Sequence, residues 1–367
     1  MVNGRERMLT ALDRRQPDRV PVWIHAINEV AILNIARLLR PEVPEPKAVN
    51  LMSQEEMFAL LDLLFVIHED LEIDGFTALP LSELAAVENL DDVHFRDQWG
   101  TVWARSPHGM AYVVECPLRE PGDLDSYRRP AVGPAEMFMV QLARERFGQE
   151  KAICFLMRGT FVRSWRLRGM QALLVDMIDR PGFVHRLAEM VTAYNLELCE
   201  RLVEAGADVL IVEDDIAGND RTLMSPRHFE EFIAPYNQRC LNFAQQHGLR
   251  VVRHSDGNLW PVLDRLLDMG YDGLNPLEPQ AGMHLKRVKD FCGDRICLLG
   301  NIDCGDLLCS GREEEVEAAV IQAIEDAAPG GGYVLCSSNS IHPGVKPENF
   351  LAMVRAARAH GLYPEEA

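Results

Sequence analysis

Four short apolar segments of the chain end abruptly in polar residues of the kinds that bind metals and transfer protons. They end in VEDD, RHSDGN, GNID and LCSSNSIH, and these endings contain Glu213, Asp214, Asp215, His254, Asp256, Asn301, Asp303, Cys336, Ser338, Asn339 and His342. A parallel strand buried on both faces is almost entirely apolar, so its first polar residues mark its carboxyl end, where barrel enzymes keep their active sites. Burying so many polar groups is unfavourable unless they bind something. We therefore expect an active site at these strand ends.

Two pairs in this set have the spacing of side chains that share a ligand. His254 and Asp256 are two residues apart, as are Glu213 and Asp215, and residues two apart in a strand point to the same side. Cys336 adds a thiolate, and one His, one Cys and one or two carboxylates would suit zinc while leaving a position for substrate. Taken singly, Cys336 could be a buried thiol and His254 a hydrogen-bonded histidine. Their shared location favours a site.

Several other polar residues at strand ends have two interpretations. Arg158 could bind a carboxylate or phosphate of a substrate, or it could form a salt bridge with the Glu213 group. Asp214 and Asp303 could serve the site or cap neighbouring helices. His342, in a loop before the last helix, is interpreted as a surface histidine. The candidate substrate-binding residues are His25, Arg158, Asn301, Asp303 and Asn339.

The elements that must position these residues are eight short apolar runs separated by stretches with helical periodicity, the pattern of repeated βα units. The runs are 20–26, 75–79, 152–159, 208–215, 250–256, 273–277, 296–303 and 332–338. Segments 181–206 and 225–248 have apolar residues at three- and four-residue steps and end in Gly, which predicts amphipathic helices. Pro226 and Pro347 mark helix starts. The sequence thus predicts a (β/α)8 TIM barrel, with residues 1–367 as a single domain.

Residues 80–134 do not fit a βα unit. The stretch from Val93 to Leu118 alternates like hairpin strands with turn residues between them. We predict a hairpin insertion after the second strand that covers the barrel rim. Its aromatic residues could instead serve as a lid or as the surface of a homodimer.

Composition and charge limit the classes of partner. The chain has 37 Lys and Arg against 56 Asp and Glu, a formal charge of −19, which disfavours binding to nucleic acid or to an anionic membrane. No apolar run approaches the roughly 18 residues of a membrane span, and the first residues lack the apolar core of a signal peptide, so we expect a cytoplasmic protein. The nine cysteines include no CxxC pair, which excludes a zinc ribbon or finger.

With these positions in hand, the chain resembles the uroporphyrinogen decarboxylase superfamily, which includes decarboxylases and corrinoid-dependent methyltransferases on the same barrel. The similarity spans almost the whole length and is carried by RERMLTALDRRQPDRVPV, GADVLIVEDDIAGNDRTLMSPRHFEEFIAPY, HSDGN, GLNPLEPQAGM, LLGNID and SNSIHPGVKPEN. The decarboxylases carry an arginine-bearing RQAGR-like segment after the first strand to hold the carboxylates of the porphyrin. The matching stretch here, VWIHAINEVAI, has no arginine. That departure and the acidic chain argue against decarboxylation of a porphyrin.

The methyltransferase branch is similar to this chain at the metal positions, where its members carry His-x-Cys on the fifth strand and a distant Cys near the eighth. Here His254-Ser255-Asp256 and Cys336 stand in those places, and Glu213 or Asp215 would complete a harder site. The resemblance implies Zn²⁺ bound by His254, Cys336, Glu213 and Asp256. The implied catalytic residues are Glu213, Asp215 and His254.

The activity that this resemblance implies is that of an O-demethylase component. Zinc would polarise the ether of a small methyl donor, which we predict to be a methoxylated aromatic, as the methyl group passes to Co(I) of a corrinoid (cobalamin). A separate small corrinoid-binding protein would carry that cofactor, because this chain has no DxHxxG-type cobalamin signature. The alternatives are methyl transfer from a methyl-corrinoid to a thiol or tetrahydrofolate, and decarboxylation of a porphyrin or another acid. A non-catalytic barrel that binds a corrinoid protein is disfavoured by the many ionisable groups at the strand ends.

Overall fold

The computed structural model describes residues 2–40, 43, 52–84, 88–106 and 111–363. Seven strands form one sheet in the order β1-β6-β7-β8-β9-β10-β11, and every neighbouring pair is parallel. The strands are β1 (Gly75–Ala78), β6 (Ala152–Arg158), β7 (Val209–Glu213), β8 (Arg250–His254), β9 (Gly273–Asn275), β10 (Cys297–Ile302) and β11 (Tyr333–Ser337). Each lies within one of the predicted apolar runs.

The eighth predicted run closes the ring. Val22 bridges to Leu335 of β11 and Trp23 to Gly75 of β1, both in parallel orientation. Trp23 N donates to Leu335 O at 3.0 Å, whereas Pro21 has no N–H to add to a ladder. Segment 20–27 therefore lies between the first and last strands of the sheet, and the predicted (β/α)8 barrel is confirmed.

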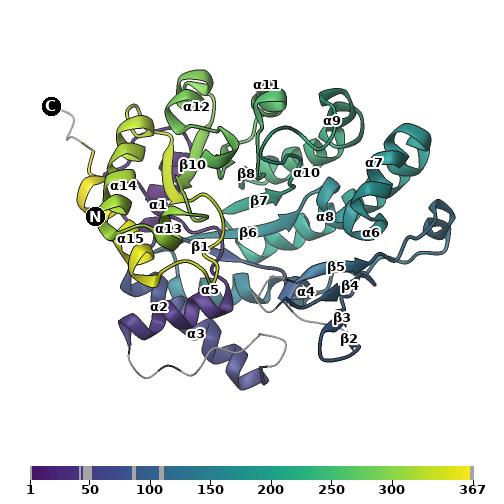
Figure 1. Ribbon diagram of the computed structural model, residues 1–367, viewed down its shortest axis with the longest axis horizontal. Helices are drawn as coiled ribbons and strands as arrows, with labels where there is room; N and C mark the ends of the chain where they lie inside the picture. The colour runs from purple at the N-terminus through teal and green to yellow at the C-terminus, as the bar shows by residue number, and fades with distance from the viewer. Residues whose placement is uncertain (1, 41–42, 44–51, 85–87, 107–110, 364–367) are drawn as a thin grey trace.

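Helices pack around this ring (Figure 1). They are α1 (Gly4–Leu12), α2 (Glu29–Leu39), α3 (Gln54–Asp70), α4 (Leu81–Leu84), α5 (Phe138–Phe147), α6 (Thr160–Arg168), α7 (Met170–Asp179), α8 (Pro181–Ala205), α9 (Pro226–Phe232), α10 (Ala234–Gln246), α11 (Leu263–Met269), α12 (Leu285–Cys292), α13 (Leu307–Ser310), α14 (Glu313–Ala327) and α15 (Pro347–His360). Gly206 ends α8 in a left-handed conformation, as predicted. The single helix predicted over 225–248 is wrong: it is divided at Ile233, because Pro235 suits the first turn of a new helix rather than a helix interior.

The inner side of the barrel is a separate apolar layer. It contains Met8, Ala11 and Leu12 of α1 together with alternate strand residues, including Trp23, Cys154, Ile211, Val252, Leu299, Val334 and Cys336. Helix α1 thus fills one end of the barrel. Because alternate residues of a strand share a face, the next inward positions toward the carboxyl ends are His25, Arg158, Glu213, His254, Asn275 and Asn301.

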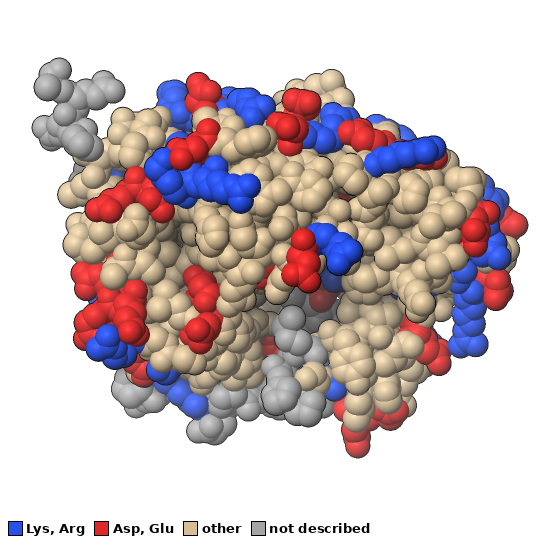
Figure 2. Space-filling model, turned by 45° about the horizontal axis from the view of Figure 1, so that its top comes forward, with Lys and Arg blue, Asp and Glu red and all other residues tan. Residues whose placement is uncertain are grey.

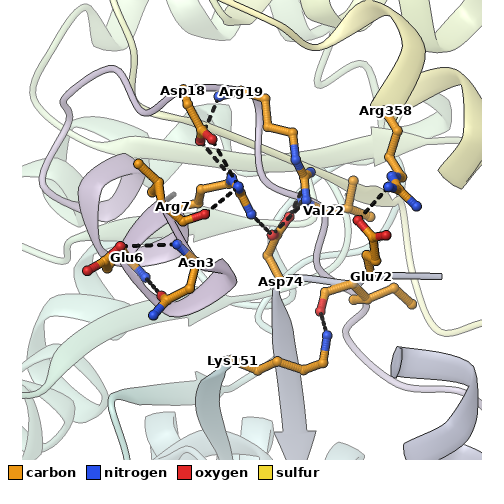
Figure 3. A network of polar contacts seen from close by, with 12 residues as sticks. Asn3, Glu6, Arg7, Asp18, Arg19, Val22, Glu72, Asp74, Lys151 and Arg358 are labelled. Carbon is orange, nitrogen blue, oxygen red and sulfur yellow. Dashed lines mark hydrogen bonds and ion pairs between the residues drawn. The ribbon is translucent and has the colours of Figure 1, made fainter. Parts of the chain in front are cut away.

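The amino-terminal end of the barrel carries a buried, fully paired carboxylate. Asp74, just before β1, accepts hydrogen bonds from Arg7 Nη1 at 3.0 Å, from both terminal nitrogens of Arg19 at 3.0 Å, and from Val22 N at 2.8 Å. Figure 3 shows Arg7 and Arg19 converging on Asp74. Polar groups at this end of a barrel stabilise the fold.

The predicted insertion is a small antiparallel sheet that follows the second barrel strand. Its strands are β2 (Glu88–Asn89), β3 (His94–Arg96), β4 (Val102–Ala104) and β5 (Tyr112–Glu115), in that order. It lies against α6, where Leu118 N donates to Leu167 O at 3.0 Å. Because α6 starts directly after β6, the insertion covers part of the carboxyl-terminal rim, as predicted. Parts of the predicted range, 85–87 and 107–110, lie outside the described residues.

None of the helices in the described ranges is long and apolar enough to cross a membrane. Basic and acidic side chains are interspersed on the face shown in Figure 2, which is hollowed near its middle. On this face, positive charge is not segregated from negative charge.

Candidate active site

Three side chains at the carboxyl ends of β7 and β8 form a group that could hold a metal ion. Asp215, His254 and Asp256 each offer one ligand atom, and these atoms lie within 4.8 Å of one another. His254 Nε2 is 3.5 Å from Asp256 Oδ1 and 3.9 Å from Asp215 Oδ1. The structure thus brings together two of the predicted ligands, His254 and Asp256, with Asp215, which was predicted as catalytic.

Asp256 supplies the observation that bears most directly on a metal. Its Oδ1 is buried and has no hydrogen-bond partner among the described residues, whereas Oδ2 accepts from Asn339 Nδ2 at 2.7 Å. Burial, opposed by His254 and reinforced by Asp215 and Glu278, raises the pKa of Asp256 to about 6. A buried carboxylate oxygen without a hydrogen-bond donor, beside other acidic groups, is unfavourable, and a bound cation would stabilise it. One imidazole nitrogen and two carboxylate oxygens fit zinc.

Asn275, at the end of β9, orients the histidine of this group. Its Nδ2 donates to Leu299 O at 3.0 Å and to Cys336 Sγ at 3.2 Å, so its Oδ1 accepts from His254 Nδ1 at 2.5 Å. The proton on Nδ1 leaves Nε2 free toward the two aspartates, as a metal-binding histidine requires. Sequence reasoning missed Asn275, although it stands two residues after Gly273 and therefore faces the barrel interior.

Cys336, which was predicted as a metal ligand, is not among the three residues of this group. Its side chain is fully buried in the inner apolar layer, and burial raises the pKa of the thiol well above its usual range. Asn339, three residues further along, reaches the group instead through its hydrogen bond to Asp256.

Glu213, which was also predicted as a ligand, is likewise not among the three residues of this group. It forms a close ion pair with Arg158, which was one of the two interpretations of that arginine. Its Oε2 is 3.4 Å from His25 Nε2, and His25 stacks on His254 with ring centroids 4.0 Å apart. Burial, together with His254 and Arg158, lowers the pKa of His25 well below its usual value. His25 is therefore a neutral ring beside the predicted ligand histidine.

Further arginines that sequence analysis did not single out meet at Glu83 of α4. Glu83 Oε2 lies 3.1 Å from Arg158 Nε and 3.2 Å from Arg166 Nη1, and Oε1 forms a close pair with Arg163. Against the effect of burial, the three guanidinium groups hold the pKa of Glu83 well below its usual range. The signal in the sequence was a set of arginines at positions 158, 163 and 166, directly after an apolar run.

The remaining candidates bond within the protein. Asp214 accepts from Val162 N at 2.7 Å in the first turn of α6, and Asp303 accepts from Leu307 N at 3.1 Å at the start of α13, so the capping interpretation holds for both. Asn301 donates to Leu277 O at 2.9 Å, and His342 bonds Cys304 O at 3.0 Å. The structure does not bring Asn301 or Asp303 into the group around His254.

These features define the chain as a (β/α)8 barrel with a candidate metal centre at its carboxyl-terminal mouth. Residues 105–360 match the family described as Uroporphyrinogen decarboxylase (URO-D). Since the match covers more than half of the chain, the protein belongs to this family, as its resemblance predicted.

Relatives within the family differ in the reaction for which they are named. A solved methyltransferase from Methanosarcina mazei superposes with a TM-score of 0.77 at 25% identity, covering 98% of this chain and 99% of that one. The methylcobamide:CoM methyltransferase MtaA of Methanosarcina barkeri is 28% identical over 223 residues, which are 61% of this chain and 62% of MtaA. The uroporphyrinogen decarboxylase of Alkalilimnicola ehrlichii is 24% identical over 378 residues, covering 98% of this chain and 94% of that protein. Family membership therefore leaves the reaction to be argued from the site.

Proposed function

We propose that the protein is a zinc-dependent methyltransferase. It moves a methyl group from a small donor, a methoxylated aromatic, to Co(I) of a corrinoid carried by a separate small protein. The observation that supports this is the group of Asp215, His254 and Asp256 with its buried, unpartnered carboxylate oxygen. The arginine-bearing segment that decarboxylases use for a porphyrin is missing, and the superposed solved relative is a methyltransferase.

In this proposal Asp215, His254 and Asp256 hold the zinc, and three protein ligands leave a position open for the donor. When bound, the metal supplies Lewis acidity toward the heteroatom of the donor, and the corrinoid supplies the methyl acceptor. Asn275 keeps the proton of His254 on Nδ1. His25 carries its own proton on Nε2 toward Glu213, which leaves its Nδ1 as a buried acceptor that has no partner among the described residues. That atom can position a polar hydrogen of the donor or of a water molecule.

Metal analysis with a matched pair of histidine variants tests the proposal. Purified protein should contain one zinc per chain, and His254→Ala should lose both the zinc and methyl transfer from 4-methoxybenzoate to cob(I)alamin. His94→Ala removes an exposed histidine of the insertion that pairs with Asp91, and it should retain both. If the purified protein contains no stoichiometric zinc and His254→Ala still transfers the methyl group, the mechanism is wrong.

Two other reactions have specific support among the relatives. The name of MtaA favours methyl transfer from a methylated corrinoid to a thiol. An assay with methylcobalamin and CoM as substrates would detect this reaction. The decarboxylases, which align over nearly the whole chain, favour loss of CO2 from uroporphyrinogen, which product analysis would detect. Turnover of uroporphyrinogen by the metal-free protein would favour the decarboxylase.

A further inference from the structure

The arginines around Glu83 form a second polar group at the barrel mouth, which the proposed metal chemistry does not use. We call Arg158, Arg163 and Arg166 the arginine group. All three side chains are largely buried, with 16%, 6% and 13% of their surface exposed. Buried guanidinium groups are stable only when anions pair with them.

Glu83 and Glu213 do not satisfy the arginine group completely. Arg158 uses Nε on Glu83 and Nη1 on Glu213. Arg163 and Arg166 both depend on Glu83, whose two oxygens therefore serve three guanidinium groups. Arg166 bonds Glu83 through Nη1, and its buried Nε has no hydrogen-bond partner among the described residues.

The electrostatics agree with this shortage of negative charge at Arg166. Burial and the positive charge of Arg158 lower the pKa of Arg166 to about 9, even though Glu83 and Asp215 are close enough to raise it. A guanidinium group held in that way would be stabilised by one more anion.

The insertion holds the arginine group rigidly in place. The guanidinium of Arg163 lies 4.5 Å from the ring centroid of Trp99, and that of Arg166 lies 5.0 Å from that of Trp103. Trp103 is itself fixed by a 2.9 Å hydrogen bond from Nε1 to Asp97. The free donor of Arg166 is therefore a preorganised feature, because its guanidinium is clamped between an aromatic ring and a carboxylate.

Arg158 of the arginine group lies two strands away from His254 of the candidate metal centre. Arg158, Glu213 and His254 are in register on the neighbouring strands β6, β7 and β8. Two strand spacings separate the backbone of Arg158 from that of His254 by about 10 Å. Arg166, on α6, is close enough to Asp215 of the candidate metal centre for that carboxylate to raise its pKa, so a small substrate bound by Arg166 would lie beside the metal centre.

We propose that Arg166, with Arg158 beside it, binds the carboxylate of the substrate, so that the methyl donor is a methoxylated aromatic carboxylic acid. The inference rests on the proposed function and assigns its substrate class. A carboxylate matches the planar fork of a guanidinium. As a monoanion, it is also repelled less by Glu83 and Glu213 than a phosphate dianion would be.

Direct binding tests this assignment without any need for turnover. Isothermal titration of the zinc-loaded and the metal-free protein would compare 4-methoxybenzoate and benzoate with the neutral 4-methoxybenzamide. We expect the acids to bind at least tenfold more tightly than the amide in both forms of the protein. Equal affinity for the acid and the amide, or displacement of benzoate by inorganic phosphate at lower concentration than by acetate, would overturn the assignment.

A set of arginine variants locates the binding. Arg166→Gln should weaken 4-methoxybenzoate at least tenfold, and Arg166→Lys, which keeps the charge but loses the fork, should fall between Arg166→Gln and the parent protein. Arg119→Gln alters an exposed arginine that pairs with Glu115, and it should bind like the parent. If Arg166→Gln unfolds, Arg166→Lys alone decides: parental affinity for the acid in that variant contradicts the role of the guanidinium fork.

The substrate class and the reaction can fail separately. If the acids bind through Arg166 but no methyl group reaches cob(I)alamin, the proposed reaction is wrong and the anion site stands. If neutral methoxybenzene is demethylated as fast as 4-methoxybenzoate, the reaction stands and the anion site is wrong.

Discussion

The two ends of the barrel differ in whether their buried polar side chains have hydrogen-bond partners. At the amino-terminal end every oxygen of Asp74 and Asp208 is paired: Asp208 accepts from Arg5, from Arg144 and from Ile153 N at 2.8 to 2.9 Å. At the carboxyl-terminal end Asp256 Oδ1, His25 Nδ1 and Arg166 Nε are buried without a partner in the described part of the chain. Because burying an unpaired polar atom is unfavourable, such atoms indicate where a ligand belongs.

Removing one carboxylate charge at the paired end should have the largest effect on folding. Asp74→Asn leaves the buried Arg19 without the carboxylate that both its terminal nitrogens bond, and Arg7 with Asp18 alone. We expect the free energy of unfolding to fall by about 3–5 kcal/mol. Denaturant unfolding measures the change. Asp18→Asn removes an exposed partner of the same Arg7 and should lower stability by less than about 1 kcal/mol; equal losses in the two variants would contradict the comparison.

An aspartate-to-asparagine substitution at the carboxyl-terminal end should impair methyl transfer without lowering the free energy of unfolding. Asp256→Asn removes a candidate ligand, and methyl transfer to cob(I)alamin should fall at least about 100-fold, since even partners that only orient ligands are worth 10- to 100-fold. The free energy of unfolding of the metal-free protein should not decrease, because the amide relieves repulsion with Asp215 and Glu278. Zinc content and chemical denaturation report the two effects, and a large loss of stability would make Asp256 a structural residue.

The lowered pKa of a buried histidine, His68, predicts how the free energy of unfolding depends on pH. His68 of α3 is buried against Phe76 and donates from Nδ1 to Leu64 O, and burial lowers its pKa to about 4. The unfolded chain therefore takes up the proton first, near pH 6.5, so stability is lost as the pH falls from 6.5 toward 4. The contribution of His68 between pH 7 and pH 5 is about 2 kcal/mol. His68→Gln should be less sensitive to pH than the parent protein by that amount in urea unfolding; an unchanged slope would refute it.

The smallest effect concerns a residue that only positions a ligand. Asn275→Ala removes the acceptor that orients His254, and we expect zinc affinity to fall about tenfold. Asn349→Ala removes a buried asparagine that bonds Leu308 O and Gly311 O and does not belong to the group, so it should lower stability but leave zinc affinity unchanged. Competition with a chelator distinguishes the two variants, and equal zinc affinity in both would remove Asn275 from the site.

The fold and half of the site could be predicted because they depend on periodicity. Eight apolar runs predicted the barrel, and the two-residue spacing of His254 and Asp256 predicted that their side chains would lie together, as they do. Asn339, which bonds Asp256, was predicted only as a substrate-binding residue. It follows β11 in a loop, and no periodicity in the sequence predicts the path of a loop. Glu83 was missed for the same reason, since it lies in a four-residue helix after β1 and meets its arginines only through the tertiary fold.

The hydrogen bond between Asn339 and Asp256 has a consequence for biosynthesis. All three candidate ligands have been synthesised once residue 256 is added. The donor that fixes Asp256 Oδ2, however, comes from the segment after β11, and the barrel closes only when β11 pairs with segment 20–27. A nascent or truncated chain that ends before Tyr333 would contain Asp215, His254 and Asp256 and still lack an ordered metal site. Tight binding of the metal would therefore require that the whole barrel has been synthesised and has closed.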